Sequence, residues 1–262
     1  MPAHTYIKEA EMFILYVLVF IFGTIIGSFL NAVIYRVPRN ESIVYPPSHC
    51  ANCQHELKPY DLIPIVSYIV LRGKCRYCGN RISIRYPIVE LLTGLIYLIL
   101  FVYFGISIKS LSYAFLASLL IVISFIDMEH KIIPNKIILI GLIVGASFRL
   151  ITINYGVWDY IVGFLVGGGV LLLISLLSGG GMGGGDIKLM AMIGLFVGWK
   201  LTVSTLFLAV VLGAIGGVAL ILFKIKTRKD YIPFGPYISI GCVISILYGY
   251  DLLNLYIKLI RG

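Results

Sequence analysis

The segment Ser178-Gly-Gly-Gly-Met-Gly-Gly-Gly-Asp-Ile-Lys188 places six glycines and one carboxylate between two apolar segments that resemble membrane helices. Glycine in a helix interior costs about 1 kcal/mol relative to alanine, so this run is unsuited to a regular spanning helix. It predicts a loop or a broken helix whose backbone comes close to another group. Asp186 at its end either caps a helix beginning at Ile187 or acts chemically, if the chain supplies a second carboxylate at the same depth.

Apolar segments surround this loop and fill most of the chain. Of 262 residues, 60% are hydrophobic and only 13% are charged. A hydrocarbon core about 30 Å thick needs roughly 20 apolar residues per helix. We therefore predict an all-α polytopic membrane protein in the lipid bilayer, with about eight spans. They are Phe13–Tyr35, Pro87–Phe104, Ser110–Ile126, Ile137–Ile153, Tyr160–Leu177, Ile187–Gly198, Leu201–Phe223 and Phe234–Tyr250.

The net charge of +9 fits membrane topology better than a nucleic-acid partner, because the basic residues are not interleaved with aromatic residues on one compact domain. Fifteen of the 21 lysines and arginines lie on one side of the eight-helix arrangement, which the positive-inside rule assigns to the cytoplasm. The N-terminus is then external. The predicted domains are 1–35 with the first helix, a cytoplasmic polar domain at 36–86 and a seven-helix domain at 87–262.

Asp127 is the second carboxylate, because the predicted third span ends beside it on the cytoplasmic side, like Asp186. Alone, Asp127 could be a solvated residue of a charged turn. Two acids converging at a membrane boundary are a functional hypothesis, and a pair that shares one proton suits peptide hydrolysis. Gly183, Gly184 and Gly185 would then let an extended substrate approach. From the helix ends we predict that Asp186 is the resting base and Asp127 carries the proton.

Four cysteines in the polar domain form two Cys-x2-Cys pairs with 21 residues between them. This spacing is typical of a structural tetrahedral zinc site, in which four thiolates leave no open position for catalysis. Two disulfides are the alternative, which a reducing cytoplasm disfavours. Zinc is expected to fold a segment with too few apolar residues for its own core. The predicted ligands are Cys50, Cys53, Cys75 and Cys78.

Together these motifs resemble the bacterial type IV prepilin peptidases, the leader peptidases with N-methyltransferase activity. The resemblance extends over nearly the whole chain. It is carried by Gly27-Ser-Phe-Leu-Asn-Ala-Val-Ile-Tyr-Arg-Val-Pro38, the cysteine tetrad with Asp61-Leu-Ile-Pro64, Ser67-Tyr68 and Leu71-Arg-Gly-Lys-Cys75, Arg85-Tyr-Pro87 with Glu90, Asp127, Gly183-Gly-Gly-Asp186-Ile-Lys-Leu189, and Pro233-Phe-Gly-Pro236.

The resemblance implies a membrane aspartyl protease of the Gly-x-Gly-Asp type in the bacterial inner membrane, with Asp127 and Asp186 in the catalytic positions. It implies removal of the basic leader from type IV prepilin or pseudopilin precursors on the cytoplasmic side. Methylation of the new N-terminal amine by S-adenosylmethionine would follow, and the cysteine-bearing loop is associated with that step in the family. Glu90, with the 27–31 region, is a candidate for the methyl-donor site, whether it faces the bundle interior or reaches the interface.

Three alternatives stay open. A peptidase without methyltransferase activity, resembling preflagellin or signal-peptide peptidases, is disfavoured by the long cysteine loop. An ion- or proton-coupled transporter would use Asp127 and Asp186 as relay groups, but we find no inverted repeat of the kind many transporters have. A zinc-bound membrane scaffold would use the acids only as helix caps. The oligomeric state cannot be predicted.

Overall fold

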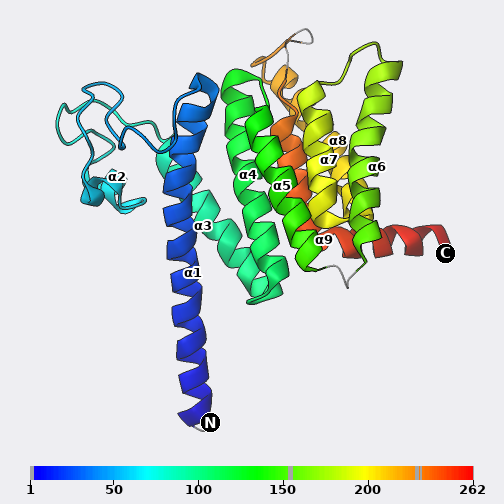
Figure 1. Ribbon diagram of the computed structural model, residues 1–262, viewed down its shortest axis with the longest axis horizontal. Coiled ribbons are helices and arrows are strands. Elements are labelled where there is room, and N and C mark those ends of the chain that lie inside the picture. Colours follow the sequence, from blue (N-terminus) through cyan, green and yellow to red (C-terminus); the bar gives the residue numbers. More distant parts are fainter. Residues whose placement is uncertain (1–2, 153–155, 228–229, 231, 262) are drawn as a thin grey trace. The chain divides into compact units, whose positions relative to one another are not determined.

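The computed structural model describes residues 3–152, 156–227, 230 and 232–261, which form helices and loops with no strand among them (Figure 1). The predicted all-α fold is therefore confirmed. The α-helices are α1 (Ala3–Arg36), α2 (Val66–Val70), α3 (Arg85–Phe104), α4 (Ile108–His130), α5 (Asn135–Ile151), α6 (Val157–Leu177), α7 (Gly184–Val197), α8 (Trp199–Leu222) and α9 (Gly235–Arg261), and the 3-10 helices are η1 (Val37–Arg39) and η2 (Pro59–Leu62).

Six of the described helices, namely α1, α3, α4, α6, α8 and α9, are long and apolar enough to cross a membrane. The other two predicted spans form α5 and α7, which have only 17 and 14 residues. A multi-pass membrane protein is thus supported, whereas the number of eight spans is not confirmed. Ile153, the predicted end of the fourth span, lies outside the described residues.

The chain divides into two compact units, residues 1–114 and 115–262, and the division falls within α4. The predicted domains 1–35, 36–86 and 87–262 divide the sequence by composition and expected role, and they stay a prediction.

In the first unit, α1 packs against α3 through residues without side chains. A Cβ atom on Gly23 would lie 2.8 Å from the Cα of Gly94, and one on Gly27 would lie 2.7 Å from the Cα of Glu90. Real Cβ atoms do not come this close, so only glycine allows the two backbones to meet. The same seam continues to Asn31, whose Nδ2 donates a hydrogen bond of 3.0 Å to the carbonyl oxygen of Tyr86.

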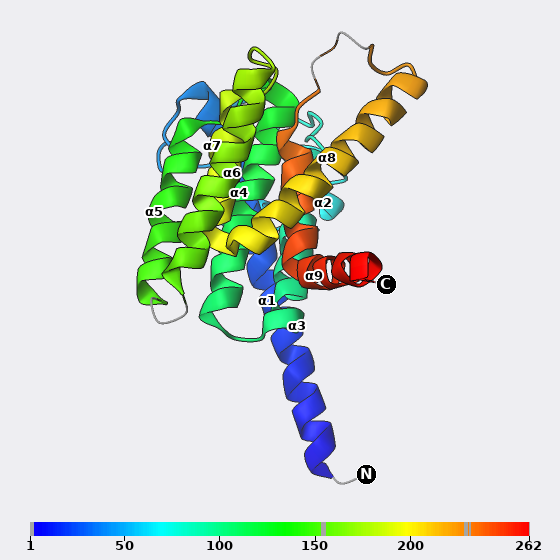
Figure 2. The same cartoon turned by 90° about the vertical axis from the view of Figure 1, so that its right-hand side faces the viewer.

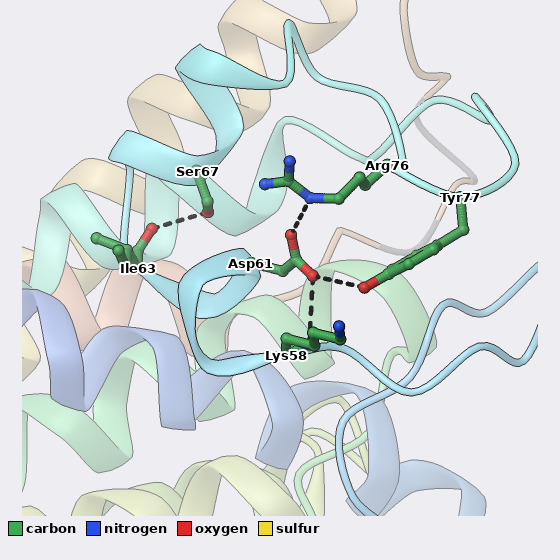
Figure 3. A network of polar contacts seen from close by, with 6 residues as sticks. All are labelled: Lys58, Asp61, Ile63, Ser67, Arg76 and Tyr77. Carbon is green, nitrogen blue, oxygen red and sulfur yellow. Dashed lines mark hydrogen bonds and ion pairs between the residues drawn. The ribbon is translucent and has the colours of Figure 1, made fainter.

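The segment between α1 and α3 is held by polar contacts rather than by an apolar core. Figure 3 shows Asp61 of η2 at the centre of one network. Its carboxylate accepts hydrogen bonds from Nε of Arg76 at 2.6 Å, from the Tyr77 hydroxyl at 3.2 Å and from the backbone N–H of Lys58 at 3.3 Å. Asp61 therefore ties η2 to the loop that carries Cys75 and Cys78.

In the second unit, α7 is the buried helix. Nine of its 14 residues are buried, and α5, α6, α8 and α9 pack around it (Figures 1 and 2). Gly163 and Gly167 of α6 lie against the backbone of α7, where an added Cβ would collide with the carbonyl oxygens of Gly194 and Met190. Because its neighbours cover it, α7 can be shorter than a helix that must cross lipid on its own.

Candidate active site and metal centre

Asp127 and Asp186 line the same cavity of the second unit, which has a volume of about 380 Å³. Asp127 lies in the last turn of α4 and Asp186 in the first turn of α7, and their residues are only 2% and 4% exposed. The structure thus brings together both predicted acids and the predicted glycine edge. The remaining lining residues are Lys131, Ile132, Ile133, Asn135, Gly183, Gly184, Gly185 and Lys188.

The three glycines before Asp186 have different surroundings. Gly183 is the N-cap residue of α7 and has an extended backbone, and a Cβ there would lie 2.9 Å from Oδ2 of Asp186. A Cβ on Gly185 would lie 2.9 Å from the Cβ of Ile133, in the turn between α4 and α5. A Cβ on Gly184 would meet no atom within 4 Å. Gly185 therefore needs glycine for its close approach to Ile133, a Cβ on Gly183 would push against the carboxylate of Asp186, and Gly184 has open space.

Asp186 is not the cap of its helix. The helix begins at Gly184 rather than at Ile187, and no side chain caps it. The backbone N–H of Asp186 donates a hydrogen bond of 3.0 Å to the carbonyl oxygen of Gly183. The alternative interpretation of Asp186 as an N-cap is therefore wrong, and its carboxylate stays available to the cavity.

The carboxylate of Asp127 accepts a hydrogen bond from the first residue of α9, a helix far from Asp127 in the sequence. The backbone N–H of Gly235, the first residue of α9, donates a hydrogen bond of 2.9 Å to Oδ2 of Asp127. Both this bond and the positive end of the α9 dipole favour an anion at Asp127. For Asp127 the prediction from helix ends considered only α4, whose C-terminal end has the opposite effect. Asp186 keeps the predicted helix start, in the first turn of α7, which also favours an anion, so the assignment of the proton stays a prediction.

The two acids are also coupled to each other electrostatically, since the charge of Asp127 acts on Asp186. Two buried carboxylates at one cavity repel each other when both are ionised, which favours keeping one proton on the pair. Lys188 lies beside the acids, and its Nζ donates a hydrogen bond of 2.9 Å to Oδ1 of Asn135. The arrangement can therefore supply one carboxylate and one carboxylic acid to a reacting group.

The four predicted metal ligands come together in the first unit. The sulfur atoms of Cys50, Cys53, Cys75 and Cys78 all lie within 4.8 Å of one another, and all are free thiols in the described structure, so the disulfide alternative is not observed. The two pairs lie on similar turns: the N–H of Gln54 donates to the carbonyl oxygen of Cys50 at 2.9 Å, and that of Gly79 donates to Cys75 at 3.0 Å.

The thiols of this cluster influence one another. A hydrogen bond from the backbone N–H of Asn80 lowers the pKa of Cys78 to about 7. At Cys53 a hydrogen bond from the backbone of His55 lowers the pKa, but burial and the neighbouring thiols of Cys50 and Cys78 outweigh it and raise the pKa to about 11. Four thiolates this close need a cation between them, so the donor set fits a metal ion that prefers sulfur ligands.

A second and larger cavity, of about 970 Å³, lies in the first unit between α1, α3 and the cysteine-bearing segment. Glu90 lines it and is only 7% exposed. Its Oε2 accepts a hydrogen bond of 2.7 Å from the backbone N–H of Ile65, next to α2. Glu90 thus faces the interior of its unit.

The sequence assigned no role to Gly235, which holds Asp127, and included Asn31 only as part of the 27–31 region. Gly235 lies in the Pro233–Pro236 stretch, where a glycine between prolines predicts a helix start but does not name the acid it contacts. Asn31 lies in a first span, where a lone amide in an apolar helix predicts a buried polar contact. Both signals are visible in the sequence, and both partners are supplied only by the fold.

Two family models match the chain. The bacterial peptidase A24 N-terminal domain matches residues 21–104, and the type IV leader peptidase family matches residues 114–218. The first match contains Glu90 and the four cysteines, and the second contains Asp127 and Asp186.

Curated relatives match along most of their length. A protein named prepilin leader peptidase/N-methyltransferase from Bacillus subtilis (strain 168) is 37% identical over 245 residues, which is 94% of this chain and 99% of the relative. Proteins of the same name from Stutzerimonas stutzeri and Pseudomonas putida are 32% and 34% identical, covering 92% and 87% of this chain and 93% and 89% of their own lengths. No solved structure matches the chain. With both family models matched and relatives of this identity aligned over most of both chains, the chain belongs to the type IV leader peptidase family.

Proposed function

We propose that this protein is a membrane aspartyl endopeptidase that removes the leader peptide from type IV prepilin or pseudopilin precursors and then N-methylates the new N-terminal residue. The observation that carries the proposal is the pair of buried acids, Asp127 and Asp186, at one cavity whose edge is made of glycine. The names of the relatives supply the substrate class and the second activity.

For peptide hydrolysis, we assign the base to Asp127 and the acid to Asp186. The ionised Asp127, held by the N–H of Gly235, takes a proton from water as the water oxygen attacks the scissile carbonyl carbon. Asp186 donates its proton to the carbonyl oxygen, which gives a neutral tetrahedral diol. Collapse of the diol breaks the C–N bond: Asp127 gives its proton to the leaving nitrogen, and a diol hydroxyl gives its proton to Asp186 as the new carbonyl forms, so the pair again holds one proton.

The glycine edge gives the substrate backbone access to these acids. Gly184 has no atom within 4 Å of its Cβ position, so a peptide strand can lie against its main chain. The precursor segment must be extended at the scissile bond, because a helical backbone hides its carbonyl groups in internal hydrogen bonds. An extended precursor segment can approach the acids only where the edge of the cavity carries no side chains, and the glycines provide such an edge.

The metal centre is assigned to structural zinc bound by Cys50, Cys53, Cys75 and Cys78. Four protein ligands complete a tetrahedral site, so the ion is assigned no step of either reaction. The zinc ion would join the two turns that carry the cysteine pairs. Between residues 40 and 84, only Gly73 and Cys75 are buried. A segment with so little buried surface needs such a cross-link to keep one conformation.

For methylation, the 970 Å³ cavity of the first unit is assigned to the donor, S-adenosylmethionine, with Glu90 among its binding residues. When bound, the donor would supply a methyl group to the amine, whose nitrogen loses a proton while the sulfur keeps the electrons of the broken C–S bond. The unpartnered amide oxygen of Asn31 and the carboxylate of Glu90 suit a ligand rich in N–H donors. The cavity volume lies at the upper end of the range of ligand sites, about 300–1,000 Å³.

The protein is assigned to the bacterial inner membrane with its N-terminus outside and with the zinc segment, Asp127 and Asp186 on the cytoplasmic side. The uneven distribution of lysine and arginine supports this orientation. An impermeant thiol reagent added to spheroplasts should label Ser107→Cys, in the turn after α3, and should not label Ser178→Cys, in the glycine loop. The opposite pattern would reverse the topology.

A single assay tests the function and separates its alternatives. Purified protein in lipid nanodiscs is incubated with a prepilin-like peptide and a donor carrying a labelled methyl group. Wild type should cleave and methylate, and Asp127→Ala and Asp186→Ala should not cleave. Cys75→Ser should lose methylation or stability before cleavage. Cleavage by both aspartate variants would refute the catalytic pair, cleavage without methylation would favour a peptidase alone, and proton flux without cleavage would favour a transporter.

A further inference from the structure

Asn31 has an amide orientation that the structure fixes. It is 1% exposed, and its Nδ2 donates hydrogen bonds to the carbonyl oxygens of Gly27 at 3.3 Å and Tyr86 at 3.0 Å. Both partners only accept hydrogen bonds, so the nitrogen must face them and the oxygen must face away. Oδ1 of Asn31 is buried and has no hydrogen-bond partner among the described residues. A buried unpaired acceptor of this kind is uncommon and calls for a donor.

Glu90 supplies a second acceptor in the same helix seam. Gly27, one turn before Asn31 on α1, has its Cβ position 2.7 Å from the Cα of Glu90, and Tyr86 lies one turn before Glu90 on α3. Both Asn31 and Glu90 line the 970 Å³ cavity. The carboxylate accepts hydrogen bonds from the Ile65 N–H and the Ser28 hydroxyl, and it forms no ion pair within the described part of the chain. A carboxylate has about four acceptor sites, so at least one is free.

Arginines line the same cavity, but none forms an ion pair with Glu90 in the part of the chain that the structure describes. Arg85, five residues before Glu90 on α3, lies over the ring of Tyr86. Arg36, at the end of α1, donates hydrogen bonds to the carbonyl oxygens of Ser42, Pro46 and Pro47 and thereby holds the loop after η1. Beside these arginines the cavity presents two acceptors that no cation of the described chain pairs with: the carboxylate of Glu90 and Oδ1 of Asn31, both on residues more than nine-tenths buried. Of the common charged groups, a primary ammonium fits best, because it offers three donors, no acceptor and one positive charge.

We propose that Asn31 and Glu90 form a subsite that binds a primary ammonium group through Oδ1 and the carboxylate. The inference rests on the proposed methyltransferase function, which offers two sources of this group: the new N-terminus of the cleaved precursor and the amino group of the methyl donor. The subsite binds one of them and places it at a fixed point of the cavity.

The variant for the test is Glu90→Gln, because glutamine keeps an oxygen for the Ile65 N–H and removes the charge. Thr93→Val is the matched control. Thr93 lies one turn further along α3, is fully buried and donates only to the carbonyl oxygen of Val89, and it does not line the cavity. A general disturbance of the α1–α3 seam should affect both variants, whereas loss of the ammonium subsite should affect only Glu90→Gln.

Binding of two ligand pairs to the full-length protein in nanodiscs is measured by calorimetry, without turnover. The first pair is a peptide that begins at the new N-terminus, with a free or an acetylated amine. The second pair is S-adenosylhomocysteine and its analogue without the amino group. For one pair, the free amine should bind at least about tenfold more tightly in wild type and in Thr93→Val, which is about 1.4 kcal/mol, and this preference should disappear in Glu90→Gln.

The pair that shows this behaviour identifies the source of the ammonium. A preference that is absent from both pairs in wild type, or that survives in Glu90→Gln, overturns the proposal. If Glu90→Gln does not fold, wild type alone decides: affinity for the free amine must fall as the pH rises through the pKa of that amine, while the blocked ligand is unaffected. A flat profile for both pairs also overturns it. Cleavage of an intact precursor by wild type, measured separately, tests the proposed function itself.

Discussion

Replacing Gly185 by alanine should show why a glycine is needed at this position of the candidate active site: for close packing against Ile133 or for flexibility of the loop. The new Cβ would lie 2.9 Å from the Cβ of Ile133, 3.3 Å from its Cγ1 and 3.4 Å from its Cδ1. Carbon atoms in contact prefer about 3.5–4.0 Å, so the first turn of α7 must move away from Ile133 by about 0.6–1 Å. The nearest atom is a Cβ next to the backbone, which cannot rotate out of the way. Asp186 is the next residue and must move with the turn.

This displacement sets the size of the expected effect. A misplacement of about 1 Å in a catalytic group can reduce the rate by about 100-fold. Overpacking costs about 1–3 kcal/mol of stability, and the better helix propensity of alanine returns about 1 kcal/mol of it. We therefore expect Gly185→Ala to lower kcat/KM for a prepilin-like peptide by about 10- to 100-fold, with only a small loss of thermal stability.

Gly184→Ala is the matched control, because it adds the same methyl group one residue earlier, where no atom lies within 4 Å. It should keep a melting temperature that is equal or higher, and because Gly184 borders the proposed substrate path, any loss of kcat/KM there should come from a raised KM. The double variant Gly185→Ala with Ile133→Gly removes the colliding Cβ and should recover part of the lost activity. Failure of Ile133→Gly to recover any activity in the Gly185→Ala background would refute the packing argument and would show that the loop needs glycine for conformational freedom instead.

Three further outcomes follow from the sites. In infrared spectra, the protonated-carboxyl band should be lost in Asp186→Asn and kept in Asp127→Asn, because the amide that donates to Asp127 favours its anion; the reverse pattern would return the proton to Asp127. Elemental analysis should find one zinc per chain, absent in Cys75→Ser, and full zinc in that variant would exclude the four-thiolate site. Burial raises the pKa of Asp61 and the hydrogen bond from Arg76 lowers it, and the net result is a lowered pKa. The ionised carboxylate therefore stabilises the fold above the unfolded pKa of about 3.9, and this stabilisation is lost as pH falls through the folded pKa. Asp61→Asn should therefore lower the melting temperature more at pH 7 than at pH 3, and an equal effect at both values would exclude a charge contribution.

Features that depend on local spacing could be predicted from the sequence. The two Cys-x2-Cys pairs each close a short turn, so the four sulfur atoms need only one long-range contact to form a cluster. Gly23 and Gly27, four residues apart on one helix, predict a face for close packing, and the structure places Gly94 against it. Patterns of this kind can be recognised in the sequence because their residues are neighbours on one turn or on one helix face.

Features that depend on distant partners could not be predicted. The donor to Asp127 comes from Gly235, 108 residues away, so the helix-end argument for Asp127 lacked the start of α9, which acts against the effect of α4. The length of α7 raises a related problem, because hydropathy reports an apolar segment without saying whether lipid or protein covers it. Burial by neighbouring helices permits a 14-residue helix here. Both cases are decided by tertiary packing, about which a local pattern carries no information.

The glycine run itself contains two physically different kinds of position. Gly179 and Gly180 have φ angles of +65° and +96°, which disfavour other residues, yet their Cβ positions meet no atom within 4 Å. Gly183 and Gly185 do not have a positive φ angle, but a Cβ atom on either would come too close to a neighbouring side chain: Asp186 for Gly183 and Ile133 for Gly185. The first pair turns the chain after α6, and the second pair lets the start of α7 approach the α4–α5 turn. Since only the second kind fixes the position of Asp186, substitutions there should change catalysis, whereas those at Gly179 should change folding first.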